Sequence, residues 1–503
     1  IVDERWRVAM RKEIDALEQN NTWEITSLPP GKKAISCKWI FRIKCLSDGI
    51  IERFKARLVI AGNNQVAGED FFDTFAPVAK MVSVRTLLAV ASAKQRKLYQ
   101  LDVTNAFLHG DLHEEVYMRV PTGFTHSRPN QVCRLKKSLY GLRQSPQNWF
   151  AKLRASIESY GFVQSKADYT LFTLHKNDVV VILLIYVDDI LLAGNDDFAC
   201  TAIKEFLRSC FHIKDLGVLK YFLGIEIAHG PSGLFLSQQK YALDILQEVG
   251  LLAFKPCSFP LEVNHKLATT QSPPFSDQAR YRHLIGRLVY LTIIGPKLSY
   301  AMHVLSQFMQ SPTEAQYQAI LRVLRYIKGD LGQGLLLRKD CDLQLHAYSY
   351  SDWASCPLTR RSVTGYFVML GSSPISWKTK KLPTVSRSSA KAEYRDMAVA
   401  TSELIWIKSF LTSLGVLHAT PMQLYCDNQA AIHIVANPVF HERTKHIELD
   451  CHFVRDHVLR NSIRTCYIRS DHQLADIFTK ALGMLPFIFL RDKLGISSLH
   501  APS

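Results

Sequence analysis

Two adjacent aspartates interrupt the apolar stretch LLIYVDDILLAG at residues 183–194. β-Branched and aliphatic residues flank Asp188 and Asp189 on both sides, a composition typical of two strands joined by a tight turn. Neighbouring carboxylates in apolar surroundings need a counter-charge, and a divalent metal with oxygen ligands is the usual one. A solvent-exposed turn is the alternative, and for two aspartates alone it is the more common case.

A third carboxylate favours the metal site over the exposed turn. Asp102, in YQLDVTNAFLHGDL, directly follows the short apolar strand that we expect at Leu98–Leu101. If this strand and the one before Asp188 end together, Asp102 lies beside Asp188. The carboxylates then form a cage suited to Mg²⁺ or Mn²⁺, as phosphoryl transfer with two metal ions requires.

Composition narrows the class of protein. The 503-residue chain has 61 Lys and Arg against 45 Asp and Glu, a net charge of +16 that favours a polyanionic partner such as nucleic acid. A merely basic enzyme is the open alternative. The 11 cysteines form no CxxC pair, which indicates a reducing compartment. No apolar run approaches the ~20 residues that cross a bilayer, and we expect no membrane partner. The first residues, IVDERWRVAM, predict a piece of a longer protein.

Sequence patterns divide the chain into three parts. A Ser-, Thr- and Pro-rich linker is expected at residues 268–278, and a weaker break at 328–334. From about Cys341 the pattern alternates between strands and helices, which predicts an α/β domain. The expected elements are a strand from Leu343 to Ala347, strands at 364–370 and 375–378, a helix at 389–415, a strand at 422–426 and a helix at 428–435.

Motifs along almost the whole chain, from about Trp6 to Lys480, resemble those of one family. They include FFDTFAPVAKMVSVRTLLAVA, QLDVTNAFLHGDLHEEVYM, SLYGLRQSPQNWF, YVDDILLAG, RRSVTGYFVMLG, CDNQAAIHI and ADIFTK. In this order they resemble the reverse transcriptase and ribonuclease H portion of a copia-type LTR retrotransposon Pol polyprotein. The resemblance implies an α+β polymerase right hand (fingers, palm and thumb) in residues 1–262, a linker and helical connection in 263–340, an α/β ribonuclease H-like domain in 341–485 and a C-terminal tail in 486–503.

The resemblance assigns the first metal site. Asp102 and Asp188 would hold two Mg²⁺ ions, with Asp189 in a supporting role and the main-chain carbonyl of Val103 as a further ligand. One ion would lower the pKa of the primer 3′-hydroxyl, which attacks the α-phosphate of a dNTP. The other would balance the charge of the leaving pyrophosphate.

Substrate-binding residues are also implied by the resemblance. Phe107 would lie beneath the sugar as a steric gate against a 2′-hydroxyl, although a core phenylalanine is the alternative. Gly141 and Gln144 match the stretch that backs the incoming nucleotide and the template base, with a plain turn as the alternative. Lys55 and Arg57 match basic residues of the fingers that grip triphosphate.

Two further features follow from the same comparison. The family usually has a lysine where this chain has Ala61, so one cation is absent there. The segment YFLGIEI, Tyr221–Ile227, resembles the hairpin that grips the primer end, with an ordinary strand as the alternative.

The second metal site of the family would use Glu393, Asp427 and Asp476, the last at the start of the final helix. Its fourth ligand is an aspartate where this chain has Tyr350, in SYSDWA. Asp352 lies on the same face of the strand but is displaced by about 6.5–7 Å. Bonds from Mg²⁺ to oxygen are only about 2.0–2.1 Å, so we expect impaired or absent ribonuclease H activity.

Two other segments raise questions. In IGPKLSYA, Gly295 and Lys297 replace an Arg and an Asp of the family pattern, and we expect a stability cost. The cluster HERTKHIELDCHFVRDH at 441–457 suggests zinc through His441, His446, Cys451, His452 and His457, but its spacing fits no established zinc pattern. Basic residues there, such as Arg443 and Lys445, could instead meet the backbone of a hybrid.

Two hypotheses remain open. The first is an RNA-directed DNA polymerase that binds an RNA template, a DNA primer, an RNA–DNA hybrid and dNTPs, with damaged ribonuclease H. The second is a decayed retrotransposon remnant that folds and binds nucleic acid without catalysis. The resemblance further implies other pieces of the polyprotein as partners and an intracellular location in a cytoplasmic retrotransposon particle.

Overall fold

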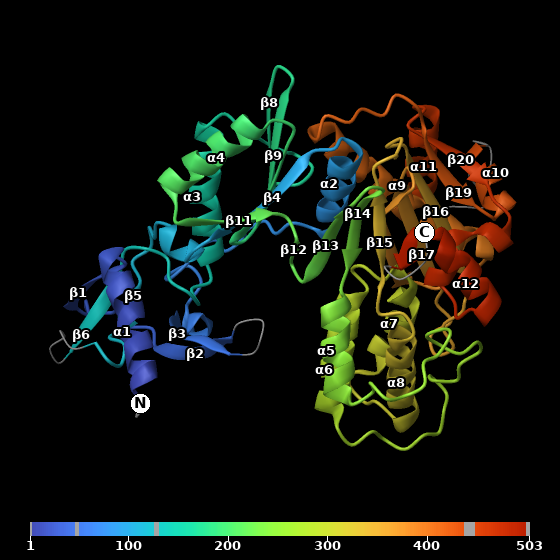
Figure 1. Cartoon of the computed structure of the whole chain (residues 1–503). Helices are drawn as coiled ribbons and strands as arrows, with labels where there is room; N and C mark the ends of the chain where they lie inside the picture. Colours follow the sequence, from blue (N-terminus) through green and yellow to red (C-terminus); the bar gives the residue numbers. More distant parts are fainter. Residues whose placement is uncertain (1–2, 46–49, 125–129, 437–447, 499–503) are drawn as a thin grey trace. The chain divides into compact units, whose positions relative to one another are not determined.

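The computed structural model describes residues 3–45, 50–124, 130–436 and 448–498 (Figure 1). Within these ranges, no helix has both the length and the hydropathy needed to cross a membrane. Internal contacts divide the chain into two compact units: Ile1–Ala79 with Leu98–Val218, and Lys80–Lys97 with Leu219–Ser503. The predicted division into four domains stays a prediction.

The first unit consists of antiparallel sheets covered by helices. Its α-helices and 3₁₀ helices are α1 (Glu4–Gln19), η1 (Gly62–Asn64), η2 (Ala106–His109), α3 (Ser145–Ser159) and α4 (Asp197–Cys210). Its strands are β1 (Trp23–Ser27), β2 (Cys37–Cys45), β3 (Ile51–Ile60), β4 (Lys97–Val103), β5 (Tyr117–Arg119), β6 (Gln131–Leu135), β7 (Val163–Gln164), β8 (Leu171–Lys176), β9 (Val179–Tyr186), β10 (Asp189–Gly194) and β11 (Ile213–Val218).

The central sheet of this unit has the strand order β11-β4-β10-β9-β8-β7. The predicted strand, turn and strand around Asp188 are confirmed as β9 and β10, which pair antiparallel. Alternate apolar residues of these strands, such as Leu183 and Ile190, pack in one core with Trp149 of α3 and Ile203 of α4. Because β4 lies next to β10, the sheet places the turn after β9 beside the end of β4.

The second unit is larger. Its α-helices and 3₁₀ helices are α2 (Met81–Ala93), α5 (Gln239–Val249), α6 (Gln278–Leu291), η3 (Pro296–Leu298), α7 (Ser299–Leu305), η4 (Ser306–Phe308), α8 (Glu314–Lys328), α9 (Ser389–Ser413), α10 (Gln429–Ala436), α11 (Glu448–Leu459), η7 (Ser470–His472), η8 (Leu474–Phe478) and α12 (Met484–Lys493). Its strands are β12 (Tyr221–Phe222), β13 (Ile225–Gly230), β14 (Gly233–Ser237), β15 (Gln333–Arg338), β16 (Leu345–Asp352), β17 (Val363–Leu370), β18 (Ser373–Lys381), β19 (Met422–Cys426), β20 (Ile463–Tyr467) and β21 (Ile496–Ser498).

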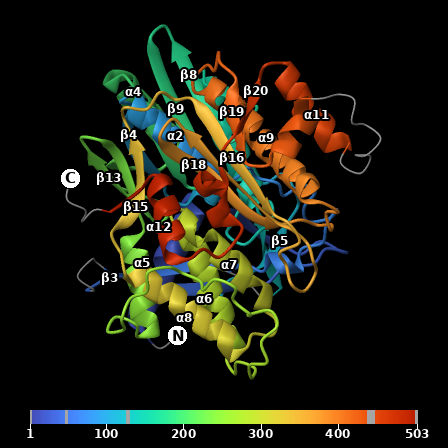
Figure 2. The same cartoon turned by 90° about the vertical axis from the view of Figure 1, so that its right-hand side faces the viewer.

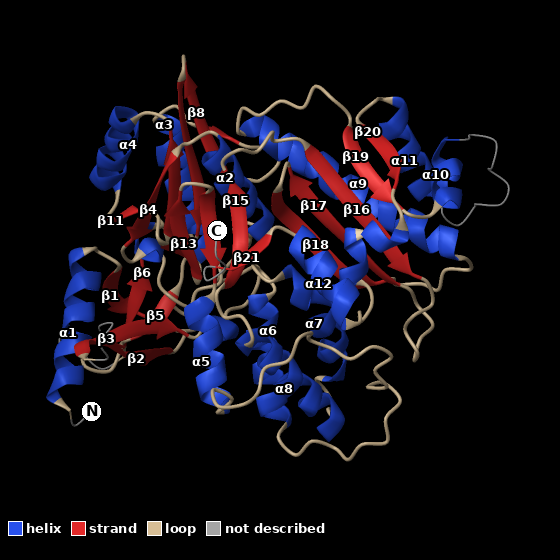
Figure 3. Ribbon diagram, turned by 45° about the vertical axis from the view of Figure 1, so that its right-hand side comes forward, coloured by secondary structure: helices blue, strands red, loops and turns tan. Residues whose placement is uncertain are grey.

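A mixed sheet of order β18-β17-β16-β19-β20 forms the C-terminal part of this unit. The strands β18, β17 and β16 are antiparallel neighbours, whereas β16, β19 and β20 run parallel. The long helix α9 connects β18 to β19 and packs on β16 (Figure 3). The sequence prediction of strand, hairpin, helix, strand and helix is confirmed, except that Leu343 adopts a left-handed turn with φ of 57° before the strand begins.

Helix α2 folds with this second unit, although it belongs to the predicted polymerase segment. It packs on β14, β15 and β18 (Figure 2). The buried guanidinium of Arg85 donates hydrogen bonds to the carbonyl oxygens of Ile375, at 2.8 Å, and Ile293, at 2.7 Å, and lies 3.9 Å from the ring centroid of Trp377. In the second sheet of this unit, β12-β13-β14-β15-β21, the predicted hairpin at Tyr221–Ile227 is confirmed as β12 and β13.

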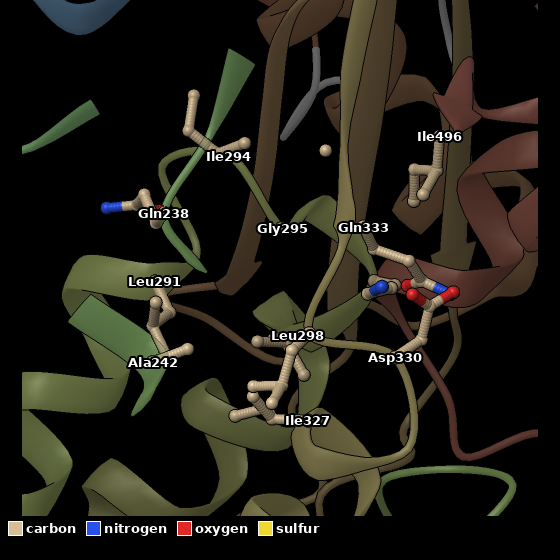
Figure 4. Close-up of a pocket in the computed structure, with 13 residues that line it drawn as sticks. Gln238, Ala242, Leu291, Ile294, Gly295, Leu298, Ile327, Asp330, Gln333 and Ile496 are labelled. Carbon is tan, nitrogen blue, oxygen red and sulfur yellow. The ribbon is translucent and has the colours of Figure 1, made fainter. Parts of the chain in front are cut away.

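Helices α5 to α8 share an apolar core with residues of α12 and of the mixed sheet. A cavity of about 50 Å³ lies beside this core (Figure 4). Leu298 and Ile327 line one part of it, and Asp330 and Gln333 lie together in another. Lys297 also lines the cavity and is only 8% exposed, and its burial lowers its pKa to about 7.

We expect Lys297→Met to stabilise the protein by about 2–4 kcal/mol at pH 6. The pKa of Lys297 falls from 10.5 to about 7 on folding, so the unfolded chain binds more protons between these values. The free energy of unfolding of the wild type therefore rises from pH 7 to pH 10.5, and the cost of burial is fully present below pH 7. Denaturant titrations at pH 6 and pH 9.5 test this, with Lys266→Met, at an exposed site, as the control. An unchanged or lower stability at pH 6 contradicts the prediction.

Candidate active sites

The turn that carries Asp188 is held from two sides. Val187 has a left-handed φ of 57°, which is costly for a β-branched residue. The indole Nε1 of Trp149 donates a 2.7 Å hydrogen bond to the carbonyl oxygen of Val187. The backbone N–H of Val103 donates a 2.9 Å hydrogen bond to the carbonyl oxygen of Asp188. These contacts hold a strained turn at the end of β4, a feature common at functional sites.

Asp102 and Asp188 lie close enough to interact electrostatically. Burial is the main cause that raises the pKa of Asp188, and the charge of Asp102 raises it further. Arg57 and Lys55 lower this pKa, so both cations lie within range of the same carboxylate. One detail of the prediction is wrong: β4 continues to Val103, so Asp102 lies inside the strand, where it pairs with Lys214 of β11.

Asp189 has a different environment from Asp188, as expected for adjacent residues at a strand end. Its Oδ1 accepts a 3.0 Å hydrogen bond from Nε2 of Gln100. Burial raises the pKa of Asp189, and the hydrogen bond from Gln100 partly opposes this shift. The supporting role of Asp189 stays a prediction. The role of the Val103 carbonyl stays a prediction.

Aromatic and basic side chains surround the paired carboxylates. The guanidinium of Arg57 lies 4.4 Å from the ring centroid of Tyr140, which meets Phe107 edge-on at 5.1 Å. Burial raises the pKa of Tyr140, and the charges of Asp188 and Asp102 raise it further. Sequence reasoning missed Tyr140, although it lies in the quoted motif SLYGLRQSP, directly before Gly141.

Arg57 and Lys55 both project from β3, two residues apart and therefore on one face. Arg57 donates a hydrogen bond to Oδ1 of Asn105 and lies 3.8 Å from the carboxylate of Glu13. Burial lowers the pKa of Lys55, and nearby cations, Arg57 first among them, lower it further. A crowded group of cations of this kind is suited to an anionic ligand such as triphosphate.

Gly141 and Gln144 organise the loop beside these residues. Gly141 has a φ of +97°, and a Cβ there would lie 2.1 Å from the carbonyl oxygen of Ile60. Gln144 is fully buried, and its amide accepts a hydrogen bond from Gln65 at 3.0 Å and donates one to the carbonyl of Asp70 at 2.8 Å. Glycine is therefore required at 141 for close backbone approach, whereas the Gln144 amide is bonded to protein groups.

The second group of carboxylates lies in the mixed sheet. Glu393 of α9, Cys426 of β19 and Asp427 each offer a ligand atom, and these atoms lie within 4.8 Å of one another. Oε1 of Glu393 accepts a 3.1 Å hydrogen bond from the N–H of Ser351. Burial raises the pKa of Glu393 well above its usual range. Sequence reasoning gave Cys426 no role, although it opens the quoted motif CDNQAAIHI directly before Asp427.

Asp476 lies within electrostatic reach of Asp427 and Glu393, but it is paired with a lysine. Nζ of Lys480 lies 2.8 Å from Oδ2 of Asp476 and donates a 3.3 Å hydrogen bond to the hydroxyl of Tyr350. Burial raises the pKa of Asp476 to about 6, against the opposing effect of Lys480. The prediction that Asp476 opens the last helix is wrong: it lies in the 3₁₀ helix η8, and α12 begins at Met484.

Two more acidic residues, Asp352 and Asp396, lie near the carboxylates of the second site. Asp352 keeps a pKa raised chiefly by burial, and the charge of Lys480 lowers it. Asp396, one helical turn after Glu393, is 1% exposed and accepts a 2.9 Å hydrogen bond from the N–H of Tyr350. Burial raises the pKa of Asp396 well above its usual range. Sequence reasoning missed Asp396 because only the packing of α9 on β16 buries it.

Part of the possible zinc cluster, including His441, His446, Arg443 and Lys445, lies outside the described residues. Cys451, His452 and His457 lie on α11. Among the described residues, the group of three converging metal-ligand candidates is Glu393, Cys426 and Asp427, and it includes no residue of that segment. Nothing in the described part of the chain therefore favours the zinc interpretation.

The two folds and their carboxylates define an α+β polymerase right hand followed by an α/β ribonuclease H-like domain. A family model described as reverse transcriptase (RNA-dependent DNA polymerase) matches residues 20–263. The Pol polyprotein of transposon RE1 of Arabidopsis thaliana is 45% identical over 497 residues, which cover 98% of this chain and 34% of that protein. A putative transposon Ty5-1 protein of Saccharomyces cerevisiae is 30% identical over 298 residues, 58% of this chain and 97% of that protein. The chain belongs to the copia-type retrotransposon Pol family.

This chain spans about a third of the RE1 polyprotein. Among solved structures, it is similar to a foamy viral protease-reverse transcriptase in complex with double-stranded DNA, with a TM-score of 0.48 and 10% identity over 92% of this chain and 69% of that one. It is also similar to ribonuclease H1 of Halobacterium salinarum, with a TM-score of 0.20 and 12% identity over 27% of this chain and 94% of that one.

Proposed function

We propose that this chain is an RNA-directed DNA polymerase that extends a primer 3′-hydroxyl on an RNA template by two-metal nucleotidyl transfer. The proximity of Asp102, near the end of β4, to Asp188, in the turn before the neighbouring strand β10, carries this proposal. The cations Lys55 and Arg57 act on the same carboxylate and would bind the triphosphate of a dNTP. Asp102, Asp188 and these cations together match the needs of phosphoryl transfer.

The carboxylates fit a divalent metal. Among the described residues, no lysine or arginine forms an ion pair with Asp102, which is partly buried, or with Asp188, which is exposed. Neighbouring carboxylates that lack a direct ion-pair partner favour a hard cation with oxygen ligands, such as Mg²⁺ or Mn²⁺. When bound, such ions would supply activation of the 3′-hydroxyl and neutralise charge on pyrophosphate. Asp102 and Asp188 would hold them, and Gln100 would orient Asp189 behind them.

Primer extension on an RNA template with dNTPs and Mg²⁺ tests the proposal. The proposal is supported if the purified chain extends the primer and if this extension requires both the RNA template and the metal. A protein that is folded by circular dichroism, binds an RNA–DNA hybrid in a salt-dependent way and extends no primer would support the alternative, a decayed remnant. The same proposal includes the binding partners, which are an RNA template, a DNA primer, an RNA–DNA hybrid, dNTPs and other pieces of the polyprotein. It also includes a location in a cytoplasmic particle.

Ribonuclease H activity is proposed to be impaired. Tyr350 replaces a carboxylate with a phenol, whose pKa burial raises to about 12, so the side chain stays neutral and cannot supply the missing negative charge. The ammonium of Lys480 lies between this phenol and Asp476, and it offsets the charge that a metal would otherwise balance. One carboxylate is therefore absent, and a second is already paired.

We expect Phe107→Val to raise the incorporation of ribonucleotides relative to deoxyribonucleotides by ~10–100-fold. The ring of Phe107 is partly buried and rests against Tyr140, a position suited to contact with a sugar. The ratio of kcat/KM for rNTP and dNTP tests this, with Phe198→Val, at an 88% exposed site in the same unit, as the control. If Phe107 serves only the core, both substrates lose activity together and the ratio stays constant.

A further inference from the structure

A pocket of about 380 Å³ lies between helix α9 and the edge strand β18, apart from both groups of carboxylates. Residues of β17, β18, the loop after β18, α9 and α11 line it. Of the described residues in its lining, none is a carboxylate assigned to the second site, Glu393, Asp427 or Asp476. Its volume falls within the range of about 300–1,000 Å³ that is common for small-molecule sites.

Three cations line this pocket. Lys378 and Lys380 lie two residues apart on β18, so both project from the face of the sheet that α9 covers. Arg395 comes from α9, and its guanidinium donates a 2.5 Å hydrogen bond to the hydroxyl of Thr384, in the loop after β18. Neither lysine has an ion-pair partner among the residues that the structure describes. Two unpaired ammonium groups beside a guanidinium favour an anionic ligand, and phosphate is the anion that such groups commonly bind.

Two acidic side chains also line the pocket, but they remove little of this positive charge. Asp396 is 1% exposed, and its Oδ2 accepts a 2.9 Å hydrogen bond from the N–H of Tyr350. Burial raises the pKa of Asp396 well above its usual range, which favours the neutral acid. Burial also raises the pKa of Asp450, and the charge of Arg395 opposes this shift. Asp450 therefore balances Arg395, and the two lysines keep their charge for a ligand.

Apolar and aromatic side chains give the pocket room for more than a bare anion. Tyr366 and Leu382 are buried in its lining, and Val399 of α9 is 40% exposed. Inorganic phosphate would leave much of this volume empty. A phosphate ester with a planar or apolar body would place its charge beside the lysines and its body against Leu382 and Val399, and a nucleotide has this chemistry.

We propose that this pocket binds the terminal phosphate of a nucleotide, with the phosphate monoester beside Lys378 and Lys380 and the nucleoside against Leu382 and Val399. A free nucleoside monophosphate and the 5′-phosphate end of a nucleic acid strand share this chemistry. The pocket uses no carboxylate that would hold a metal ion. Binding should therefore need no divalent cation and should be the same in the wild type and Asp188→Asn.

Calorimetric titration of the full chain with adenosine 5′-monophosphate, in the presence of EDTA, tests the proposal. We expect binding at one site, with adenosine and inorganic phosphate each at least ~10-fold weaker. Val399→Trp would fill the pocket from a partly exposed position, and we expect it to weaken binding by at least ~10-fold. The double variant Lys378→Ala with Lys380→Ala, at two exposed positions, should weaken binding by a similar factor. Lys240→Ala, at an exposed site on α5, is the matched control and should leave the affinity unchanged.

Two oligonucleotides that differ only in a 5′-phosphate separate the two sources of the ligand. A preference for the phosphorylated strand that Val399→Trp abolishes supports a strand end, whereas adenosine monophosphate binding without this preference supports a free nucleotide. Equal affinity for adenosine monophosphate in the wild type and Val399→Trp, or no binding by the wild type, overturns the inference. If Val399→Trp does not fold, an unchanged affinity in the lysine double variant overturns it. Absent primer extension with intact, metal-independent nucleotide binding would refute the polymerase proposal alone.

Discussion

Asp188→Asn is expected to lower primer extension by at least ~10³-fold with little loss of stability. Asparagine preserves the shape of the side chain and keeps the turn, whose contacts to Trp149 and Val103 use backbone atoms of residues 187 and 188. It removes the charge that would hold the metal beside Asp102. Single-turnover extension on an RNA template, with Mg²⁺ varied, measures the loss.

The raised pKa of Asp188 gives this prediction a second readout. Because burial raises the pKa in the folded state, the ionised carboxylate costs folding free energy, and that cost is present above the folded pKa. Without metal at pH 7, Asp188→Asn should therefore melt at the same temperature as the wild type or higher. Mg²⁺ should raise the melting temperature of the wild type more than that of the variant. A variant that melts well below the metal-free wild type would indicate a structural role instead.

Asp189→Asn is the matched control for this experiment. Its side chain is bonded to Gln100, and an amide can keep that position. We expect a loss of activity of only about tenfold, because the proposed mechanism gives Asp189 a supporting role and leaves the metal pair to Asp102 and Asp188. Equal losses in both variants would contradict the division of roles between the two neighbours.

Tyr350→Asp is expected to raise Mg²⁺-dependent cleavage of the RNA strand of a hybrid by at least ~10²-fold over the wild type. The new carboxylate would stand on β16 close to Asp476 and Lys480, where the phenol of Tyr350 now accepts a hydrogen bond from Lys480. It would complete a set of four carboxylates with Glu393, Asp427 and Asp476. A fixed-time cleavage assay on a labelled hybrid measures the gain.

Tyr350→Phe is the control for the hybrid-cleavage experiment with Tyr350→Asp. It removes the hydrogen bond with Lys480 but adds no charge, so it should give no cleavage. A wild type that already cleaves the hybrid as fast as Tyr350→Asp would refute the proposed impairment. If Tyr350→Asp also stays inactive, the pairing of Lys480 with Asp476 is the next cause to test, through the double variant Tyr350→Asp with Lys480→Met.

The sequence by itself determined the elements whose signal is local. β-Branched and aliphatic composition predicted β9 and β10, and a helical pattern predicted α9, because side-chain burial repeats about every 3.6 residues in a helix. Family motifs identified the carboxylates of both sites and the replacement at Tyr350, since each lies in a recognisable stretch. The strand β4 was predicted to end too early, at Leu101. Its last residues, Asp102 and Val103, pair with β11, a strand more than 100 residues away in the sequence.

Only the tertiary structure decided which groups lie together. Asp396 is buried solely because α9 packs on β16, and Lys480 reaches Tyr350 only because η8 folds against the same sheet. The pairing of Cys426 with Glu393 likewise joins residues from a strand and a helix. Such contacts depend on long-range packing, which leaves no periodic signal in the chain. Sequence reasoning could therefore name the carboxylates, but not the contacts that the thiol of Cys426, the buried acid Asp396 and Lys480 make around the second site.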